Sequence, residues 1–62
     1  MEKRFMQAED VAEELSVSVS YAYKIIRQLN AELKEKGFIT ISGRVSREYF
    51  NKRVYGSGEE VN

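Results

Sequence analysis

Residues 8–30, AEDVAEELSVSVSYAYKIIRQLN, decide the fold of this chain. The first part of this stretch has apolar side chains at positions i, i+3, i+4 and i+7, a spacing that puts them on one face of a helix. These residues are Ala8, Val11, Ala12 and Leu15. The spacing predicts an amphipathic helix over residues 7–15.

A longer second helix is expected over residues 19–36. Ser18 precedes it, and its hydroxyl can accept a hydrogen bond from a backbone N–H of the first turn. Gly37 follows it and can adopt the left-handed conformation that ends many helices. The apolar side chains of this segment also fall on one face. They are Ala22, Ile25, Ile26, Leu29 and Leu33.

The break between the two helices has the spacing of a helix-turn-helix. This motif needs a small residue where the helices cross and an apolar residue in the turn. Ala12 and Val17 meet these two requirements, and Ala22 is one of the contacts on the second helix. Ser16 stands where the turn commonly has glycine, so its backbone is expected near the left-handed region.

A change of period after Gly37 predicts a small β-hairpin. Residues 38–41 are mostly β-branched or aromatic, Ser42-Gly43 suits a turn, and residues 44–46 supply a second strand. Ser46 can then cap a final short helix over residues 47–53. The predicted fold is mainly α, a winged helix with three helices and a short β-hairpin wing.

One domain is expected over residues 1–56, followed by a disordered acidic tail over residues 57–62. A chain of 62 residues buries only about 60% of its unfolded surface, so its stability depends on one small core. The predicted core consists of Val11, Ala12, Leu15, Val17, Ala22, Ile25, Ile26, Leu29, Leu33, Ile39, Ile41, Val45, Tyr49 and Phe50.

The formal net charge is zero, but the charges are unevenly distributed. Residues 18–57 contain eight basic and three acidic side chains, a balance of +5. The segments before and after have balances of −3 and −2. This asymmetry indicates one basic face on a neutral protein, which a DNA-binding domain needs. Ordinary solvated surface charge is the alternative explanation.

The outward face of the second helix is expected to enter the major groove of DNA. Ser18 and Ser20 lie at its N-terminus, where hydroxyls and backbone N–H groups can meet phosphates or base edges. The side chains of Lys24, Arg27 and Gln28 suit guanine, phosphate and adenine, respectively.

Tyr21 and Tyr23 border the same face, and one of them is expected to donate to a phosphate oxygen. Alternatively, their rings pack on the domain while the hydroxyls reach water. Arg44 follows the predicted wing turn, where it suits a narrow minor groove, although it could merely solubilise an exposed loop. Lys36 and Arg47 flank the wing and could hold phosphates.

Several classes of function are not supported by the composition. The chain has no Cys and no His, which removes disulfides, Cys-based zinc sites and the commonest general base. The acidic residues of the first helix form a charged face rather than a paired pocket. We therefore expect no catalytic residue, no enzyme activity, no cofactor and no metal. No apolar run approaches the roughly 20 residues of a membrane span, and a cytoplasmic location without membrane contact is expected.

Residues 7–56 resemble the small winged-helix excisionases of phages and integrative conjugative elements, which are related to the MerR-type DNA-binding domain. The resemblance rests on AEDVAEELSVSVSYAYKIIRQLN and on ELKEKGFITISGRVSREYFNKRVYG, where a wing precedes a short SREYF helix. The chain differs from the typical excisionase in its longer second helix and in reaching the wing through Lys36-Gly37-Phe38.

The resemblance implies sequence-specific binding of double-stranded DNA by an excisionase-type recombination directionality factor or small regulator of a mobile genetic element. Excisionases of this kind bind next to recombination sites, bend DNA and direct the integrase towards excision. An integrase (tyrosine recombinase) and further copies of this chain on adjacent DNA sites are the partners implied. Two alternatives stay open: a transcriptional repressor of a phage or conjugative element, and a protein-interaction module that does not bind DNA.

Overall fold

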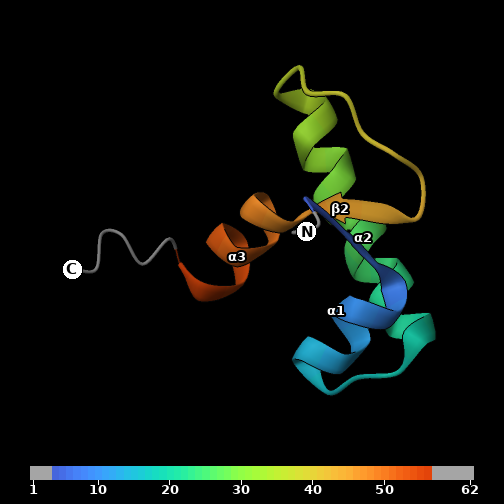
Figure 1. Cartoon of the computed structure of the whole chain (residues 1–62). Helices are drawn as coiled ribbons and strands as arrows, with labels where there is room; N and C mark the ends of the chain where they lie inside the picture. The colour runs from blue at the N-terminus through green and yellow to red at the C-terminus, as the bar shows by residue number, and fades with distance from the viewer. Residues whose placement is uncertain (1–3, 57–62) are drawn as a thin grey trace.

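The computed structural model describes residues 4–56. The elements follow in the order β1 (Phe5–Gln7), α1 (Ala8–Leu15), α2 (Val19–Glu35), β2 (Arg44–Ser46) and α3 (Arg47–Tyr55), as Figure 1 shows. The three predicted helices are confirmed, and α3 extends two residues beyond its predicted end. The tail predicted over residues 57–62 lies outside the described residues.

The turn between α1 and α2 has the geometry predicted from its sequence. Ser16 has a left-handed backbone, with φ 57° and ψ 47°. Among residues 4–56 no other residue except glycine has a positive φ. The N–H of Val17 donates to the carbonyl of Ala12 at 3.0 Å, which closes the end of α1. The chain thereby reverses within a few residues and places α2 across α1, as a helix-turn-helix requires.

Side chains cap the N-termini of α1, α2 and α3. The backbone N–H of Gln7 donates to Asp10 Oδ2 at 3.0 Å at the start of α1. Ser18 and Ser46 cap α2 and α3 as predicted, each accepting from a backbone N–H three residues further on. These caps satisfy N–H groups that have no partner within the helix.

The two-stranded antiparallel ribbon is confirmed, but the predicted first strand is wrong. β2 pairs with β1, with Met6 opposite Val45 in the register, rather than with residues 38–41. Residues 38–41 form no regular structure, and Ile39 is 91% exposed. The pairing with β1 wins because it buries both Met6 and Val45 against the helices, whereas a local hairpin would leave Met6 without a place in the core.

The core lies where α1, α2 and the ribbon meet, with one side of α3 against it. Most of the predicted core is confirmed, although Leu15, Val17, Ile25 and Tyr49 are only partly buried at its edge. Ile39 and Ile41 were wrongly placed in the core, since both are exposed in the segment before β2. The buried hydrophobic residues are Met6, Ala8, Val11, Ala12, Ala22, Ile26, Leu29, Leu33, Val45 and Phe50.

Candidate nucleic-acid interface

The face of α2 that points away from the core displays most of the residues predicted to contact DNA. Ala22, Ile26 and Leu29 lie on the buried face of the same helix. The exposed residues of α2 and its N-cap include Ser18, Ser20, Tyr21, Tyr23, Lys24, Arg27 and Gln28. The helix therefore presents these side chains to solvent from a position fixed by its apolar face.

The N-terminus of α2 is open to solvent. Ser18 Oγ accepts a hydrogen bond from the Tyr21 N–H at 3.1 Å, and the Ser18 O–H can still donate. Ser20 is exposed in the first turn. Free N–H groups and the positive end of the helix dipole favour an anion such as a phosphate at this end.

We keep the name wing for residues 41–46, which are the turn closed by Ile41 and Arg44 together with β2. A hollow lies between α2 and this wing. Tyr23 and Arg27 line it with Lys34, and Ser42 and Gly43 line the opposite side. A Cβ atom added at Gly43 would lie 3.9 Å from Cε1 of Tyr23, so one side of the Tyr23 ring lies beside the turn. The Tyr23 ring thus contributes to the packing of the wing as well as to the exposed face.

The sequence analysis missed Lys34 as a member of this surface. Lys34 is exposed and lies seven residues after Arg27, two helical turns along the same face. The spacing from Arg27 could have revealed it, but Lys34 entered the sequence prediction only as one of the eight basic side chains of residues 18–57.

Arg44 and Asn30 meet where the wing returns to α2. Arg44 is exposed at the start of β2, and its N–H donates to the Ile41 carbonyl at 3.1 Å, closing the turn. Asn30 Nδ2 donates to the carbonyl oxygens of Ile41 at 3.1 Å and Arg44 at 2.7 Å. Sequence analysis did not single out Asn30, because its partners lie 11 and 14 residues along the chain and no local spacing reveals them.

Arg47 and Lys36 lie away from this surface. Arg47 is half-buried at the start of α3 and lines a hollow with Asp10, Glu13 and Glu14 of α1. Lys36 Nζ stands 5.7 Å from the centroid of the Tyr49 ring, on the side of the molecule that faces α3. The structure therefore does not group either side chain with the cations of α2 and the wing, and their contacts with DNA stay predictions.

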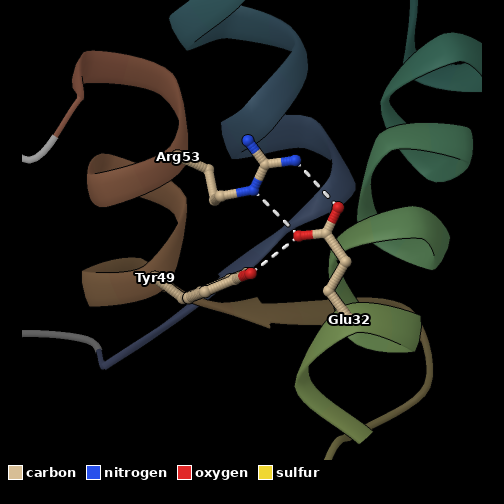
Figure 2. A network of polar contacts seen from close by, with 3 residues as sticks. All are labelled: Glu32, Tyr49 and Arg53. Atoms are coloured by element: carbon tan, nitrogen blue, oxygen red, sulfur yellow. Dashed lines mark hydrogen bonds and ion pairs between the residues drawn. The ribbon is translucent and has the colours of Figure 1, made fainter. Parts of the chain in front are cut away.

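A network of polar contacts attaches α3 to α2, as Figure 2 shows. Glu32 Oε1 accepts from the Tyr49 hydroxyl at 2.7 Å and from Arg53 Nε at 2.8 Å. Glu32 Oε2 accepts from an Arg53 terminal nitrogen at 2.8 Å, which makes the ion pair bidentate. A second contact, from the Tyr55 hydroxyl to Glu14 Oε2 at 2.6 Å, attaches the end of α3 to α1.

The network lowers the pKa of Glu32 from 4.5 to about 2. The pKa of Glu32 is lowered mainly by the hydrogen bond from Arg53 and then by the hydrogen bond from Tyr49. Gln28, one turn earlier on α2, makes a smaller contribution in the same direction. The same carboxylate raises the pKa of Tyr49. Arg53 is thus committed to Glu32, and Gln28, one of the predicted base contacts, also has a carboxylate within reach.

The remaining cations near the wing have no acidic partner in the described residues. Within residues 4–56, Arg53 is paired with Glu32, and no ion pair involves Lys24, Arg27, Lys34 or Arg44. Four unpaired positive charges along one helix face and the adjoining turn attract a polyanion. This part of the surface therefore has the charge expected of a nucleic-acid interface.

Two further observations concern the rest of the described chain. None of the helices within residues 4–56 has the length and apolar character needed to cross a membrane. In the same range, no group of three or more Asp or Glu side chains is arranged to hold a metal ion.

Comparison with known proteins agrees with the helix-turn-helix geometry. Residues 1–55 match the family model of the Mga helix-turn-helix domain. The chain is 42% identical over 52 residues to the ICEBs1 excisionase of Bacillus subtilis (strain 168), covering 84% of this chain and 81% of that protein. No solved structure shows significant similarity to it. The resemblance to small excisionases is thus confirmed, and the chain belongs to the Mga helix-turn-helix domain family.

Proposed function

We propose that this protein binds double-stranded DNA sequence-specifically and acts as an excisionase-type recombination directionality factor. Its similarity to the ICEBs1 excisionase over most of both chains supports the biological role. The single structural observation that supports DNA binding is the set of exposed, unpaired cations on α2 and the wing turn, next to a capped and solvent-facing helix N-terminus.

In the bound state α2 lies in the major groove. Lys24 and Gln28 approach base edges, where lysine suits guanine and glutamine suits adenine. Arg27 and Lys34 neutralise phosphates, and Ser18 donates its O–H to the backbone at the start of the helix. Phosphate contacts of this kind hold the helix in register, while the base contacts select the sequence.

Further predicted contacts complete the interface. Ser20 and Tyr21 lie beside the N-terminus of α2 and donate to phosphate oxygens. Arg44 extends from the wing turn towards the minor groove, where a narrow A/T-rich segment concentrates negative potential. Arg47 lines a hollow with carboxylates of α1 rather than the surface of α2 and the wing, so we assign it the smallest part.

The protein has no catalytic role in this proposal. It binds beside a recombination site and directs an integrase, a tyrosine recombinase, towards excision, with further copies of the chain on adjacent DNA sites. The integrase performs the strand transfer, and this chain binds beside the recombination site and bends the DNA.

Fluorescence anisotropy tests the DNA-binding part. DNA fragments from beside the attachment sites of the element are titrated at several salt concentrations with wild type, Lys24→Ala and Arg27→Ala. Loss of one phosphate contact is expected to reduce the salt slope by about one, whereas loss of a base contact relaxes discrimination at one position by about 1–3 kcal/mol. Lys52→Ala, the same change at an exposed position on α3, is the matched control and is expected to bind like wild type.

Three outcomes contradict the proposal at different levels. Absence of DNA binding by wild type would indicate a protein-interaction module instead, and unchanged affinity in both α2 variants would mean that α2 does not form the DNA interface. Normal DNA binding without stimulation of excision, in a reaction containing the element's integrase and both attachment sites, would indicate a repressor. Wild type is expected to stimulate excision, and Arg27→Ala to reduce that stimulation in proportion to its loss of affinity.

A further inference from the structure

The segment between α2 and β2 has little to hold it in place. Residues 38–43 include no helix or strand, and Figure 1 shows the chain running back from the end of α2 alongside this helix to β2. Phe38, Ile39 and Ile41 are 60%, 91% and 45% exposed, so apolar packing holds the segment only weakly. Something else must set the position of the turn that precedes Arg44.

The Asn30 side chain provides the attachment. Its Nδ2 atom has two hydrogens, and both have an acceptor: the carbonyl oxygens of Ile41 at 3.1 Å and of Arg44 at 2.7 Å. These two carbonyls belong to the first and last residues of the turn, which the Arg44 N–H closes onto Ile41. One amide group on α2 therefore holds both ends of the turn.

We infer that Asn30 is a positioning residue that sets the offset between the major-groove contacts of α2 and the minor-groove contact of Arg44. Asn30 lies between Arg27 and Lys34 on the side of α2 that faces the wing, and all three line the same hollow. The inference rests on the proposed DNA binding and deepens it, since Asn30 itself need not touch DNA.

The chemistry of the contact is specific to asparagine. Two carbonyl acceptors require two donors on one short side chain, which Asp, Ser, Thr and Leu do not have. Loss of the donors leaves the turn closed by the bond from the Arg44 N–H to the Ile41 carbonyl, with Gly43 beside the Tyr23 ring. The turn would then sample several positions, and binding would have to restrict it again at an entropic cost.

The test uses Asn30→Leu, which has nearly the same size and favours helix but donates no hydrogen bond. Asn51→Leu, at an exposed position on α3, is the matched control for the same change of side chain. Without DNA, backbone ¹⁵N relaxation is expected to show greater motion of residues 38–43 in Asn30→Leu, with α1, α2 and α3 unchanged. Asn51→Leu is expected to match wild type.

With DNA, a double-mutant cycle separates positioning from simple loss of stability. In wild type, Arg44→Ala is expected to lower affinity for an A/T-flanked site about tenfold, the value of one contact of about 1.4 kcal/mol. In the Asn30→Leu background the same change is expected to lower affinity less than about twofold, because Arg44 is no longer held in place. Lys24→Ala should cost the same factor in both backgrounds, since the position of Lys24 depends on α2 alone.

Two results would overturn the inference. An undiminished effect of Arg44→Ala in the Asn30→Leu background, or unchanged motion of residues 38–43, would show that other contacts position the wing. Absence of any Arg44→Ala effect in wild type would instead contradict the wing contact of the proposed function, and the inference would fail with it. The wild-type and variant measurements therefore distinguish the two failures.

Discussion

The pair α1–α2 and the segment 38–43 contain similar apolar residues but use them in opposite ways. Ile26 of α2 is 1% exposed, whereas Ile39 is 91% exposed. In the helix pair, local spacing puts one stripe of apolar side chains, including Ile26, on the face that meets the core. In the segment, β-branched residues suit a strand but have no partner, because β1 already occupies the edge of β2 that faces the core. Apolar character alone therefore does not decide burial.

Replacing matched isoleucines gives the largest effect. Ile26→Ala is expected to lower the free energy of unfolding by about 2–5 kcal/mol, through lost burial and the cavity left behind. Ile39→Ala should change it by less than about 0.5 kcal/mol, because the side chain already lies in water. Thermal or urea unfolding of the two variants measures the difference, and a substantial loss for Ile39→Ala would mean that the segment is packed.

Overpacking the helix crossing comes next. Ala12 is 7% exposed between α1 and α2, and Ala12→Leu adds volume that the close crossing cannot accept. We expect a loss of about 1–3 kcal/mol. Ala31→Leu, on the exposed face of α2, is the control for the same enlargement and should unfold at the wild-type temperature. An unchanged melting temperature for Ala12→Leu would place the crossing elsewhere.

The two turns differ in which residue adopts positive φ. Ser16 has φ 57° in the turn between α1 and α2, and Gly43 has φ 79° in the turn before β2. Ser16→Gly is expected to stabilise the protein by about 0.5–1 kcal/mol, since glycine adopts this conformation without strain. Gly43→Ala should destabilise it by about 1 kcal/mol, because alanine is strained at this positive φ. The added Cβ would lie 3.9 Å from Tyr23, an ordinary contact distance, so no steric clash adds to this loss. Melting temperatures that shift in the same direction would contradict this contrast.

The smallest effect concerns the attachment of α3 to α2. The folded pKa of Glu32, about 2, lies below its ordinary value of 4.5. The ionised form is therefore favoured by folding, and this stabilisation is complete above about 4.5 and disappears as the pH falls towards about 2. The melting temperature of wild type should therefore fall further than that of Glu32→Gln as the pH is lowered from about 4.5 to about 2.

Glu35→Gln, an exposed position on the same helix, is the control and should follow wild type. Identical acid profiles for wild type and Glu32→Gln would mean that the network is not formed in solution. Because the groups are solvent-accessible, the expected difference is modest.

The sequence predicted the helices better than the ribbon, for a physical reason. Helix boundaries depend on neighbours within four residues, and Ser18 and Ser46 revealed two of the caps directly. Strand pairing depends on residues far apart in the chain, and β1 lies about forty residues before its partner β2. Met6 was missed in the core for the same reason, since its three-residue strand is too short to show a period. Ala8 was recognised on the apolar face of the first helix but was left out of the predicted core.

The residues of the candidate interface also fall into two groups, those that local spacing predicted and those that depend on distant segments. The spacing on α2 identified Lys24, Arg27 and Gln28 as one exposed face, and the structure places them there. It could not separate Arg47 from that surface, because the carboxylates that line its hollow come from α1. Nor could it identify Asn30, whose role depends on two carbonyl groups in another segment.

The sequence by itself determined the helix-turn-helix, the caps and the left-handed Ser16, because these depend on interactions between residues that are close along the chain. Only the tertiary structure decided which strand pairs with β2, that Ile39 and Ile41 remain in water, and that Asn30 holds the wing turn. These features depend on which distant groups compete for the same surface or the same hydrogen bond. That competition is settled by the whole fold and has no local signature in the chain.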